Sequence, residues 1–432
     1  MLAGERRRSV RAPSHRPVAA VLVAAVLTLT AACTPATPDV PTGRDDQVEV
    51  VTWWASGSEK LALDALVGEF RQQHPETRFV DAAIAGGAGP AAKDLLLSRL
   101  RNGDAPDTFQ VHGGGELGDY VKARQVQGLE QLWTELGLRE DLPPRVVELL
   151  TVDGVPYAVP SDIHRANVLW TNPEVLRDAG LDPSDGYATL DEWFADLDTL
   201  RAQGQTPLAL GSTWTQLHLL EQVLLARLGP EAYSGLWDGS TDVGSEPVAA
   251  ALADFGRLLS YTNTDRDRLD WQDATQRVID GQAAFTVMGD WALIPFQQSG
   301  LTNPDGVLWS PVPGTEGSYA MVLDAFALPV GAPHPDSARE WLTTVASPEA
   351  QTALAAVKGA IPPRTDIPEA DLLPYQRWAR SSFEADRLVL SVTHGTATDS
   401  ETLDEVMTAV RRFTTGTTGP AGFQDELADA VR

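Results

Sequence analysis

The sequence predicts an α/β protein with two domains. Its 432 residues suffice for two domains of the usual size, roughly 150 to 200 residues each. Residues 48–111 alternate between strand and helix patterns, which is typical of a mainly parallel sheet covered by helices. Helical patterns dominate after an extended, proline-punctuated segment at 155–160, and we expect the chain to pass into its second domain there.

Hydrophobic spacing defines the elements of the first domain. Strands are predicted over 48–54, 77–84 and 107–111, and helices over 59–73 and 91–101. The first helix rests on four apolar residues at helical spacing: Leu61, Ala65, Leu66 and Phe70. Ligands of open parallel sheets bind beyond the carboxyl ends of the strands. The residues at those ends are therefore the first candidates for a binding site: Trp53, Trp54, the glycine loop 86–89, Gln110 and His112.

The second domain is predicted to be mainly helical. Its predicted helices span 173–179, 190–203, 216–228, 247–259 and 271–280. Thr189 and Glu192 have the spacing of a capping box at the start of the second of these helices. A strand over 283–288 follows, and extended stretches at 306–313 and 319–329 indicate a return to the first domain. The predicted lobes are an N-terminal one of residues 47–160 and 306–350 and a C-terminal one of residues 161–305 and 351–432.

The N-terminal segment predicts export and anchoring. An arginine-rich stretch precedes an uncharged run, 18–30, that is too short to span a bilayer permanently. Residues 1–32 are therefore a predicted signal peptide, and the small residues before Cys33 resemble a bacterial lipobox. We expect Cys33 to be lipidated and residues 33–46, rich in proline and threonine, to tether the body to the outer face of the cytoplasmic membrane. Ordinary secretion with a free thiol at Cys33 is the alternative.

Composition and charge exclude several classes of protein. The chain has 33 Lys and Arg against 60 Asp and Glu, a net charge of −27, and no basic stripe that would neutralise nucleic-acid phosphates. Its single cysteine excludes a disulfide framework and a thiolate metal cluster, since each needs at least two. An apolar content of 43% fits a folded globular body rather than a disordered chain.

Eight short motifs follow one another along the chain: VTWW (51–54), GGAG (86–89), PDTFQVH (106–112), IHRANV (163–168), LALG (208–211), GQAAF (281–285), VMGDW (287–291) and KGAI (358–361). Each motif is short and weak by itself. In this order and spacing they resemble the extracellular solute-binding proteins of bacterial carbohydrate ABC importers, and specifically the glucose- and galactose-binding members.

The resemblance implies a periplasmic-binding-protein-like clamp, or Venus flytrap, of two lobes with an inter-lobe hinge and a central ligand cleft. Such a receptor captures a sugar between its lobes, closes, and docks on a membrane permease. We expect a monosaccharide of the glucose or galactose type or a short glucoside, and a monomeric protein without catalytic residues, cofactor or metal. The positions that match the family's sugar contacts are Trp53, Trp54, Glu59, Gln110, His112, His164, Trp271, Trp291, Asp324, Lys358 and His394.

Sugar chemistry accounts for these residue types. A pyranose has apolar C–H faces and a ring of hydroxyls, so its binding calls for flat aromatic surfaces and hydrogen-bonding side chains. Asp324 in an otherwise apolar stretch is costly to bury unless it is paired or bonded to a ligand. Trp214 and Trp237 are assigned neither to ligand contact nor to packing. The remaining tryptophans are assigned to packing: Trp133, Trp170, Trp193, Trp341 and Trp378.

Two other functions fit parts of the sequence. A secreted glycoside hydrolase needs a pair of carboxylates at a defined separation, with Asp324 as the candidate here. A metal-ion receptor of the same fold would use His112, His164 and His394 as ligands, although the sequence has no short spacing such as His-x-x-x-His among them. The glycine segment 86–93 resembles a phosphate loop but lacks the Gly-Lys-Ser/Thr ending, which predicts a strand-to-helix turn instead.

Overall fold

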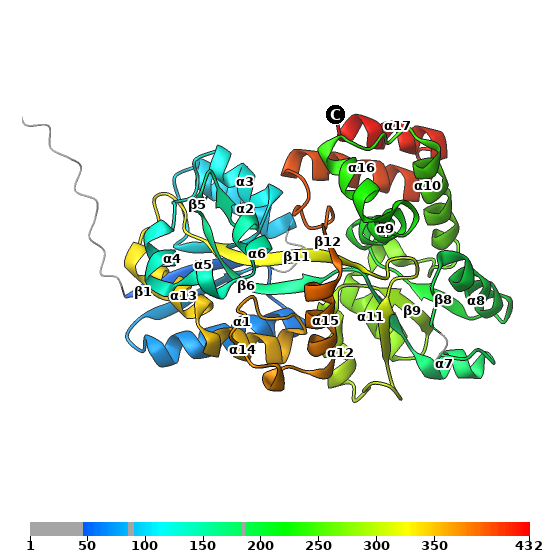
Figure 1. The fold of residues 1–432 in the computed structure, drawn as a ribbon, viewed down its shortest axis with the longest axis horizontal. Coiled ribbons are helices and arrows are strands. Elements are labelled where there is room, and N and C mark those ends of the chain that lie inside the picture. The colour runs from blue at the N-terminus through cyan, green and yellow to red at the C-terminus, as the bar shows by residue number, and fades with distance from the viewer. Residues whose placement is uncertain (1–45, 85–89, 184–185) are drawn as a thin grey trace, which may run out of the picture. The chain divides into compact units, whose positions relative to one another are not determined.

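The computed structural model describes residues 46–84, 90–183 and 186–432. The predicted signal peptide, the lipidation site at Cys33 and the glycine loop 86–89 lie outside the described residues, as does the tether except for Asp46. The described residues belong to one compact unit that contains two larger β-sheets, each with its own helices (Figure 1). The predicted α/β architecture with two lobes is confirmed.

The first lobe is built on a six-stranded mixed sheet in the order β12-β11-β3-β1-β2, with β6 also paired to β11. Its strands are β1 (Gln47–Thr52), β2 (Arg78–Ala83), β3 (Thr108–His112), β6 (Ala158–Arg165), β11 (Ser318–Ala327) and β12 (Arg387–Leu390). β1 pairs in parallel with β2 and β3, whereas β11 runs antiparallel to β3 and β6. The three strands predicted in the first domain correspond to β1, β2 and β3.

Helices pack around the first sheet. They are α1 (Gly57–Gln73), α2 (Pro90–Arg101), α3 (Gly115–Lys122), α4 (Glu130–Leu136), α5 (Leu138–Asp141), α6 (Pro144–Leu149), α13 (Pro335–Ala346) and α14 (Pro348–Lys358). A short hairpin of β4 (Thr151–Val152) and β5 (Val155–Pro156) precedes β6. α1 packs on α13 and α14 through an apolar stripe that runs from Ala62 to Phe70. Leu61, predicted to belong to this stripe, is exposed because the stripe begins one residue later.

The second lobe has a four-stranded sheet in the order β10-β7-β9-β8. Its strands are β7 (Val168–Thr171), β8 (Thr206–Ala209), β9 (Ala283–Val287) and β10 (Leu308–Pro311). Its helices and 3₁₀ turns are α7 (Pro173–Asp178), α8 (Leu190–Ala202), α9 (Thr213–Asp238), α10 (Glu246–Leu259), η1 (Arg266–Arg268), α11 (Trp271–Ile279), η2 (Asp290–Ala292), α12 (Leu293–Gln298), η3 (Glu369–Asp371), α15 (Pro374–Ala385), α16 (Ser400–Thr414) and α17 (Pro420–Ala430). Thr189 and Glu192 form the predicted capping box of α8. α9 runs past its predicted end at residue 228, but it is interrupted at Gly229, whose φ of 75° leaves the helical region just before Pro230.

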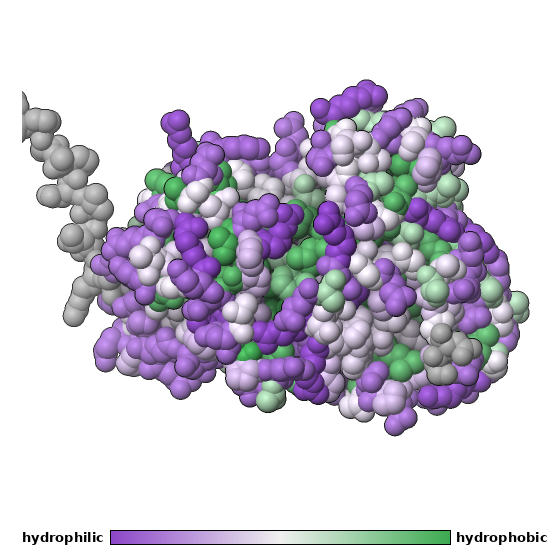
Figure 2. Space-filling model, viewed as in Figure 1, coloured by the Kyte–Doolittle hydropathy of each residue, from purple (hydrophilic) through white to green (hydrophobic). Residues whose placement is uncertain are grey.

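The surface is largely hydrophilic. Figure 2 shows mostly hydrophilic side chains on one face, in keeping with the net charge of −27. Within the described ranges, three large hydrophobic side chains are exposed: Leu61, Leu95 and Val330. None of the helices described is both long and apolar enough to cross a membrane.

Several chain segments connect the lobes, and β12 adds a further passage because it joins the first sheet between α15 and α16. Residues 166–167 join β6 to β7, residues 312–317 join β10 to β11, and residues 359–373 join α14 to α15. The first two segments are tied together by Asn167, whose Nδ2 donates a hydrogen bond of 2.9 Å to Thr315 Oγ1. The lobes are thus linked at a narrow group of crossings beside the paired strands β6 and β11.

The lobe boundaries differ from the predicted ones at three places. β6 stays in the first sheet up to Arg165, so the first crossing lies beyond the predicted boundary at residue 160. β10 pairs with β7 in the second sheet, although it lies in the stretch assigned to the first lobe. α14 packs against α1 of the first lobe, although most of it was assigned to the second. Local patterns indicate where elements begin and end, but the sheet that an element joins depends on residues far away in the chain.

Candidate functional site

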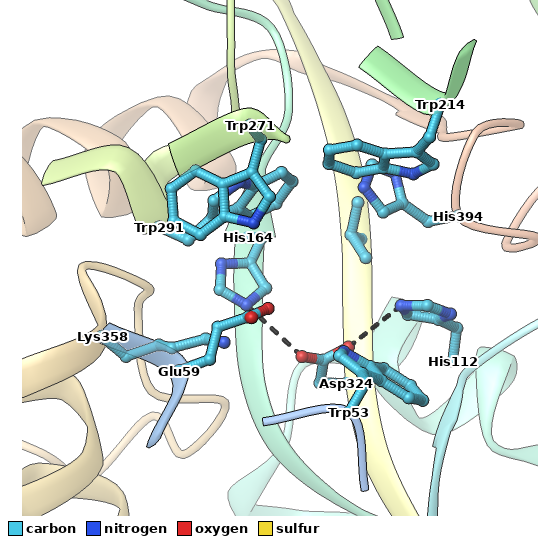
Figure 3. Close-up of a pocket in the computed structure, with 11 residues that line it drawn as sticks. Trp53, Glu59, His112, His164, Trp214, Trp271, Trp291, Asp324, Lys358 and His394 are labelled. Carbon is cyan, nitrogen blue, oxygen red and sulfur yellow. Dashed lines mark ion pairs between the residues drawn. The ribbon is translucent and has the colours of Figure 1, made fainter. Parts of the chain in front are cut away.

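A cavity of about 330 Å³ lies between the two lobes (Figure 3). Its wall consists of eleven residues: Trp53, Glu59, His112, His164, Trp214, Trp271, Trp291, Val322, Asp324, Lys358 and His394. Nine of them are among the sugar-binding positions predicted from the sequence. They come from the ends of β1, β3 and α14, from β6, β11, the first turn of α1 and the loop after β12, and from the second lobe. The chain therefore brings together residues separated by more than 300 positions.

Four tryptophans form opposing walls of the cavity. Trp214 and Trp271 stand in the first turns of α9 and α11, and Trp291 lies in the turn after β9. In Figure 3 these three rings lie on one side of the cavity, and Trp53 lies on the other side beside Asp324. The ring centroids of Trp214 and Trp291 are 6.1 Å apart. The cavity is therefore a slot between flat apolar surfaces that come from both lobes.

A chain of ionisable side chains leads from behind the cavity wall to Asp324. Lys93 Nζ lies 2.7 Å from Glu116 Oε2, which is also 2.7 Å from His112 Nδ1. Asp324 then lies between two imidazoles, with Oδ1 3.2 Å from His112 Nε2 and Oδ2 3.5 Å from His164 Nε2 (Figure 3). Burial raises the pKa of Asp324, but the hydrogen bond from His164 and the neighbouring positive charges outweigh burial and hold this pKa at about 2. Asp324 is therefore a carboxylate at neutral pH and can only accept hydrogen bonds.

His164 faces carboxylates with both of its ring nitrogens. Its Nδ1 bonds to Asp290 Oδ1, and its Nε2 lies 2.9 Å from Asp162 Oδ2. Asp290 is itself oriented by the backbone N–H of Arg165, which donates to Oδ2 at 2.8 Å. Burial lowers the pKa of His164, but the charges of Asp290 and Asp162 outweigh burial and raise this pKa well above its usual value. The His164 ring is therefore a cation with a proton on each nitrogen.

Glu59 and Lys358 lie together at another edge of the cavity (Figure 3). Glu59 is 8% exposed, and burial raises its pKa to about 7 even though the positive charge of Lys358 acts in the opposite direction. Lys358 ends α14, and its Nζ lies 4.2 Å from the centroid of the Trp54 ring, a cation–π contact. This edge therefore offers an ammonium group and a carboxyl group that changes its charge near neutral pH.

His394 enters the cavity from the loop that follows β12. Burial lowers its pKa well below the usual value, and the neighbouring imidazoles of His218 and His112 lower it further. His394 Nε2 is buried and has no hydrogen-bond partner within the part of the chain that the structure describes. The ring is thus a neutral imidazole with one nitrogen left for a ligand.

Trp54 and Gln110 do not line the cavity, contrary to the prediction. Successive side chains of extended chain point to opposite sides, so Trp54 turns into the core where Trp53 turns to the cavity. Gln110 lies behind the wall, and its Nε2 donates to Asp324 Oδ2 at 3.1 Å. Both residues support the wall instead, since Trp54 lies under the Lys358 ammonium group and Gln110 holds the Asp324 carboxylate.

Trp214 and Val322 line the cavity without having been predicted there. The sequence assigns Trp214 neither to the site nor to packing. Its position at the start of a helix after β8 is the signal that could have placed it in the cavity, because helix starts face the ligand side in open sheets. Val322 lies opposite His164 in the register of β11 with β6. An apolar residue in an apolar strand carries no signal of ligand contact, so sequence analysis had no means of finding Val322.

One group of side chains among the described residues has the spacing of a metal site. It consists of Asp162, His164 and Asp324, whose ligand atoms lie within 4.8 Å of one another. A metal-binding imidazole needs a free nitrogen lone pair, and both nitrogens of His164 face carboxylates that raise its pKa and so favour its protonated form. His112 and His394, the other imidazoles considered as ligands, are not part of this group. The carboxylates around His164 stabilise a proton on its ring, which a metal ion at this nitrogen would have to displace.

The fold and the cavity together define a receptor that encloses a small ligand between two lobes. The chain belongs to the family of bacterial extracellular solute-binding proteins, whose family model matches residues 54–352. This family consists of solute-binding receptors and not of enzymes, which removes the glycoside hydrolase from the alternatives.

Individual relatives and solved structures agree with the family. The chain is 34% identical over 368 residues to an uncharacterized ABC transporter extracellular-binding protein of Pyrococcus horikoshii, covering 84% of this chain and 82% of that protein. It is 30% identical over 397 residues to a xylose/arabinose-binding protein of Haloferax volcanii, covering 90% and 85%. A chitin oligosaccharide binding protein of known structure shares the fold with a TM-score of 0.78 and 19% identity, over 89% of this chain and 98% of that one.

Proposed function

We propose that the protein captures a monosaccharide of the glucose or galactose type, or a short glucoside, and delivers it to the membrane permease of an ABC importer. The observation that carries the proposal is the pairing of four tryptophan rings with buried charged and imidazole groups around one small cavity. The 30% identity to a xylose/arabinose-binding protein supports a sugar as the ligand class.

The aromatic walls suit the two faces of a pyranose ring. The C–H groups of such a ring present apolar patches, which bind well to the flat faces of tryptophan. Trp53 lies on one side of the cavity and Trp271 and Trp291 on the other (Figure 3), so that a ring held between them loses its apolar contact with water on both faces. Because these walls belong to different lobes, a bound sugar favours the state in which the lobes are together.

The polar groups suit the rim of hydroxyls. The Asp324 carboxylate accepts hydrogen bonds, the His164 imidazolium and the Lys358 ammonium donate them, and all three are buried residues of the cavity wall. Trp214 Nε1 and His394 Nε2 are buried without a hydrogen-bond partner in the described residues. A buried polar atom without a partner is costly, and a polyhydroxylated ligand supplies both donors and acceptors to such atoms.

The small size of the cavity favours a monosaccharide over a long oligosaccharide. The space among its eleven lining residues amounts to about 330 Å³ even when the part open to solvent is included, so a long oligosaccharide would extend beyond it. The finer parts of the proposal are a monomeric receptor, export by the segment 1–32 and anchoring through lipidated Cys33. They rest on the sequence patterns and on the family resemblance.

A thermal-shift and tryptophan-fluorescence screen of the purified protein tests the proposal. The panel is glucose, galactose, mannose, xylose, arabinose, maltose, cellobiose and trehalose, with zinc added to EDTA-treated protein as a separate arm. A sugar present at a thousand times its Kd stabilises the native state by about 4 kcal/mol, and the four cavity tryptophans report its binding.

The variants Trp291→Phe and Trp193→Phe provide a matched pair for this screen. Trp291 lines the cavity, whereas Trp193 is fully buried in the second lobe away from it. We expect the sugar response to weaken in the Trp291 variant and to persist in the Trp193 variant. Silence toward every sugar together with tight, stoichiometric zinc binding would overturn the proposal.

A further inference from the structure

The loop after β12 carries His394, a cavity imidazole that is neutral and has a free nitrogen. A neutral imidazole carries its proton on either Nδ1 or Nε2, and the partner of one nitrogen decides the state of the other. If the proton is on Nδ1, the nitrogen left for the ligand accepts a hydrogen bond. If the proton is on Nε2, that nitrogen donates one. The partner of His394 Nδ1 therefore determines which ligand group can meet this side chain.

His394 Nδ1 is 2.7 Å from Ser391 Oγ, three residues earlier in the same loop. Ser391 Oγ is in turn 2.9 Å from Glu221 Oε2, which belongs to α9 of the second lobe. The same carboxylate oxygen accepts the backbone N–H of Thr393 at 3.0 Å. All of these groups are buried, so water does not compete with the contacts.

The direction of the hydrogen bonds follows from the donors that are available. A backbone N–H can only donate, so Glu221 Oε2, which receives Thr393 N–H, is an acceptor. Burial raises the pKa of Glu221, but Oε2 also accepts the hydroxyl of Thr393 and so remains an acceptor whether or not the carboxyl group is ionised. Ser391 has a single hydroxyl proton, which it donates to this oxygen. Ser391 Oγ is then left with lone pairs only and must receive its second hydrogen bond, from the ring of His394. The proton of His394 is thereby placed on Nδ1.

We propose that Glu221 and Ser391 are positioning residues that hold His394 in the Nδ1–H form, so that Nε2 is an unprotonated acceptor for one ligand hydroxyl. The proposal rests on the proposed function for the identity of the ligand, but the tautomer itself does not depend on any ligand. It makes His394 an acceptor in a cavity where His164 and Lys358 are donors. A hydroxyl near His394 is therefore recognised through its proton rather than through its oxygen.

The other groups that face His394 do not supply a competing partner. Its ring contacts are with Trp214, Trp291, His112 and His218, with ring centroids 5.3 to 5.8 Å apart. His218 Nε2 lies 3.0 Å from the carbonyl oxygen of Ala166 and must donate to it, so this nitrogen is already engaged. The loop is also fixed on its far side, where the backbone N–H of Glu116 donates to the carbonyl oxygen of Gly395 at 2.9 Å.

Nitrogen-15 NMR of the histidine side chains in the ligand-free protein tests the tautomer directly. The His394→Gln variant assigns the resonances, since its spectrum lacks them. We expect the wild-type spectrum to show a protonated Nδ1 and an unprotonated Nε2 for His394. A protonated Nε2 in the wild-type protein overturns the proposal, whatever the protein binds.

Ser391→Ala removes the acceptor of the His394 proton, and Ser391→Thr restores a hydroxyl at the same position. We expect the alanine variant to lose the pure Nδ1–H form, and the threonine variant to regain it. Ser381→Ala, at an exposed serine of α15, is the matched control and should leave the spectrum unchanged. An unchanged His394 tautomer in Ser391→Ala would contradict the assigned role.

Binding of deoxyfluoro sugars connects the tautomer to recognition. The probes are D-glucose and D-galactose and their deoxyfluoro derivatives, in which fluorine cannot donate a hydrogen bond. Loss of one neutral hydrogen bond weakens binding roughly three- to tenfold, so one fluorinated position should bind that much more weakly to the wild-type protein. The penalty at that position should shrink in Ser391→Ala, and its persistence there would contradict the proposal. If no sugar binds at all, the proposed function fails while the NMR result still decides the tautomer.

Discussion

Burial of Glu59 makes the stability of the protein depend on pH in a defined way. The carboxyl group has a pKa of 4.5 in its ordinary environment and of about 7 in the folded protein, because burial disfavours its charged form. A carboxyl group whose pKa is raised by folding does not lower the free energy of unfolding below its ordinary pKa, because it is protonated in both states there. Above its folded-state pKa it is charged in both states, and the full cost of burying the charge lowers the free energy of unfolding. A shift of this size corresponds to about 3 kcal/mol. As the pH rises from 4.5 to 7, the growing penalty at Glu59 should therefore lower the free energy of unfolding by about 3 kcal/mol in total.

Glu59→Gln removes this effect while keeping the size of the side chain. We expect the variant and the wild type to have similar free energies of unfolding at pH 4.5, and the variant to be more stable by up to about 3 kcal/mol at pH 8. Urea unfolding followed by tryptophan fluorescence across this pH range measures the difference. Glu231→Gln, at a side chain that is 75% exposed on α9, is the control and should follow the wild type. A stability difference between Glu59→Gln and the wild type that does not change with pH would refute the reasoning.

Three further predictions concern the walls and their supports. Trp291→Ala should weaken sugar binding at least tenfold in fluorescence titrations, and should also cost about 3–5 kcal/mol in urea unfolding, because this ring is only 6% exposed. Asp290→Asn should cost about 3–5 kcal/mol, since it removes a carboxylate partner from the buried His164 cation; an effect below 1 kcal/mol would argue against that ion pair. Gly115→Ala should lower the free energy of unfolding by about 1–3 kcal/mol, because its Cβ would lie 1.9 Å from the carbonyl oxygen of Thr398. The backbone amides of residues 391–399 should also exchange hydrogen faster in the Gly115→Ala variant. Unchanged exchange would show that the close approach of Gly115 to Thr398 does not hold this loop in place.

Local hydrophobic patterns were sufficient to predict the first strands and helices of both lobes, but they did not predict the helices α3–α6 or α12–α17. The predicted strand over 107–111 is β3, and the predicted helix over 190–203 is α8 with its capping box. The lobe boundaries were not predictable in the same way. β10 and α14 carry ordinary strand and helix patterns, and their lobes are decided by pairing with β7 and packing on α1. These contacts join residues that are far apart in the sequence.

The candidate site shows the same division between local and long-range information. Residue type and motif position selected Trp53, Asp324 and seven of the other nine wall residues. They selected Trp54 as well, because a motif does not show which of two consecutive tryptophans faces the cavity. The roles of Glu221 and Ser391 had no sequence signal, since each acts through a neighbour that lies close only in the fold.

Calorimetric titration of the purified wild-type protein with D-glucose and with D-galactose at neutral pH tests the central claim most directly. The account predicts saturable heat with one sugar molecule bound per chain for at least one of the two, because the two lobes line one shared cavity. Absence of heat with both sugars, together with saturable binding of a long oligosaccharide at the same concentrations, would contradict it.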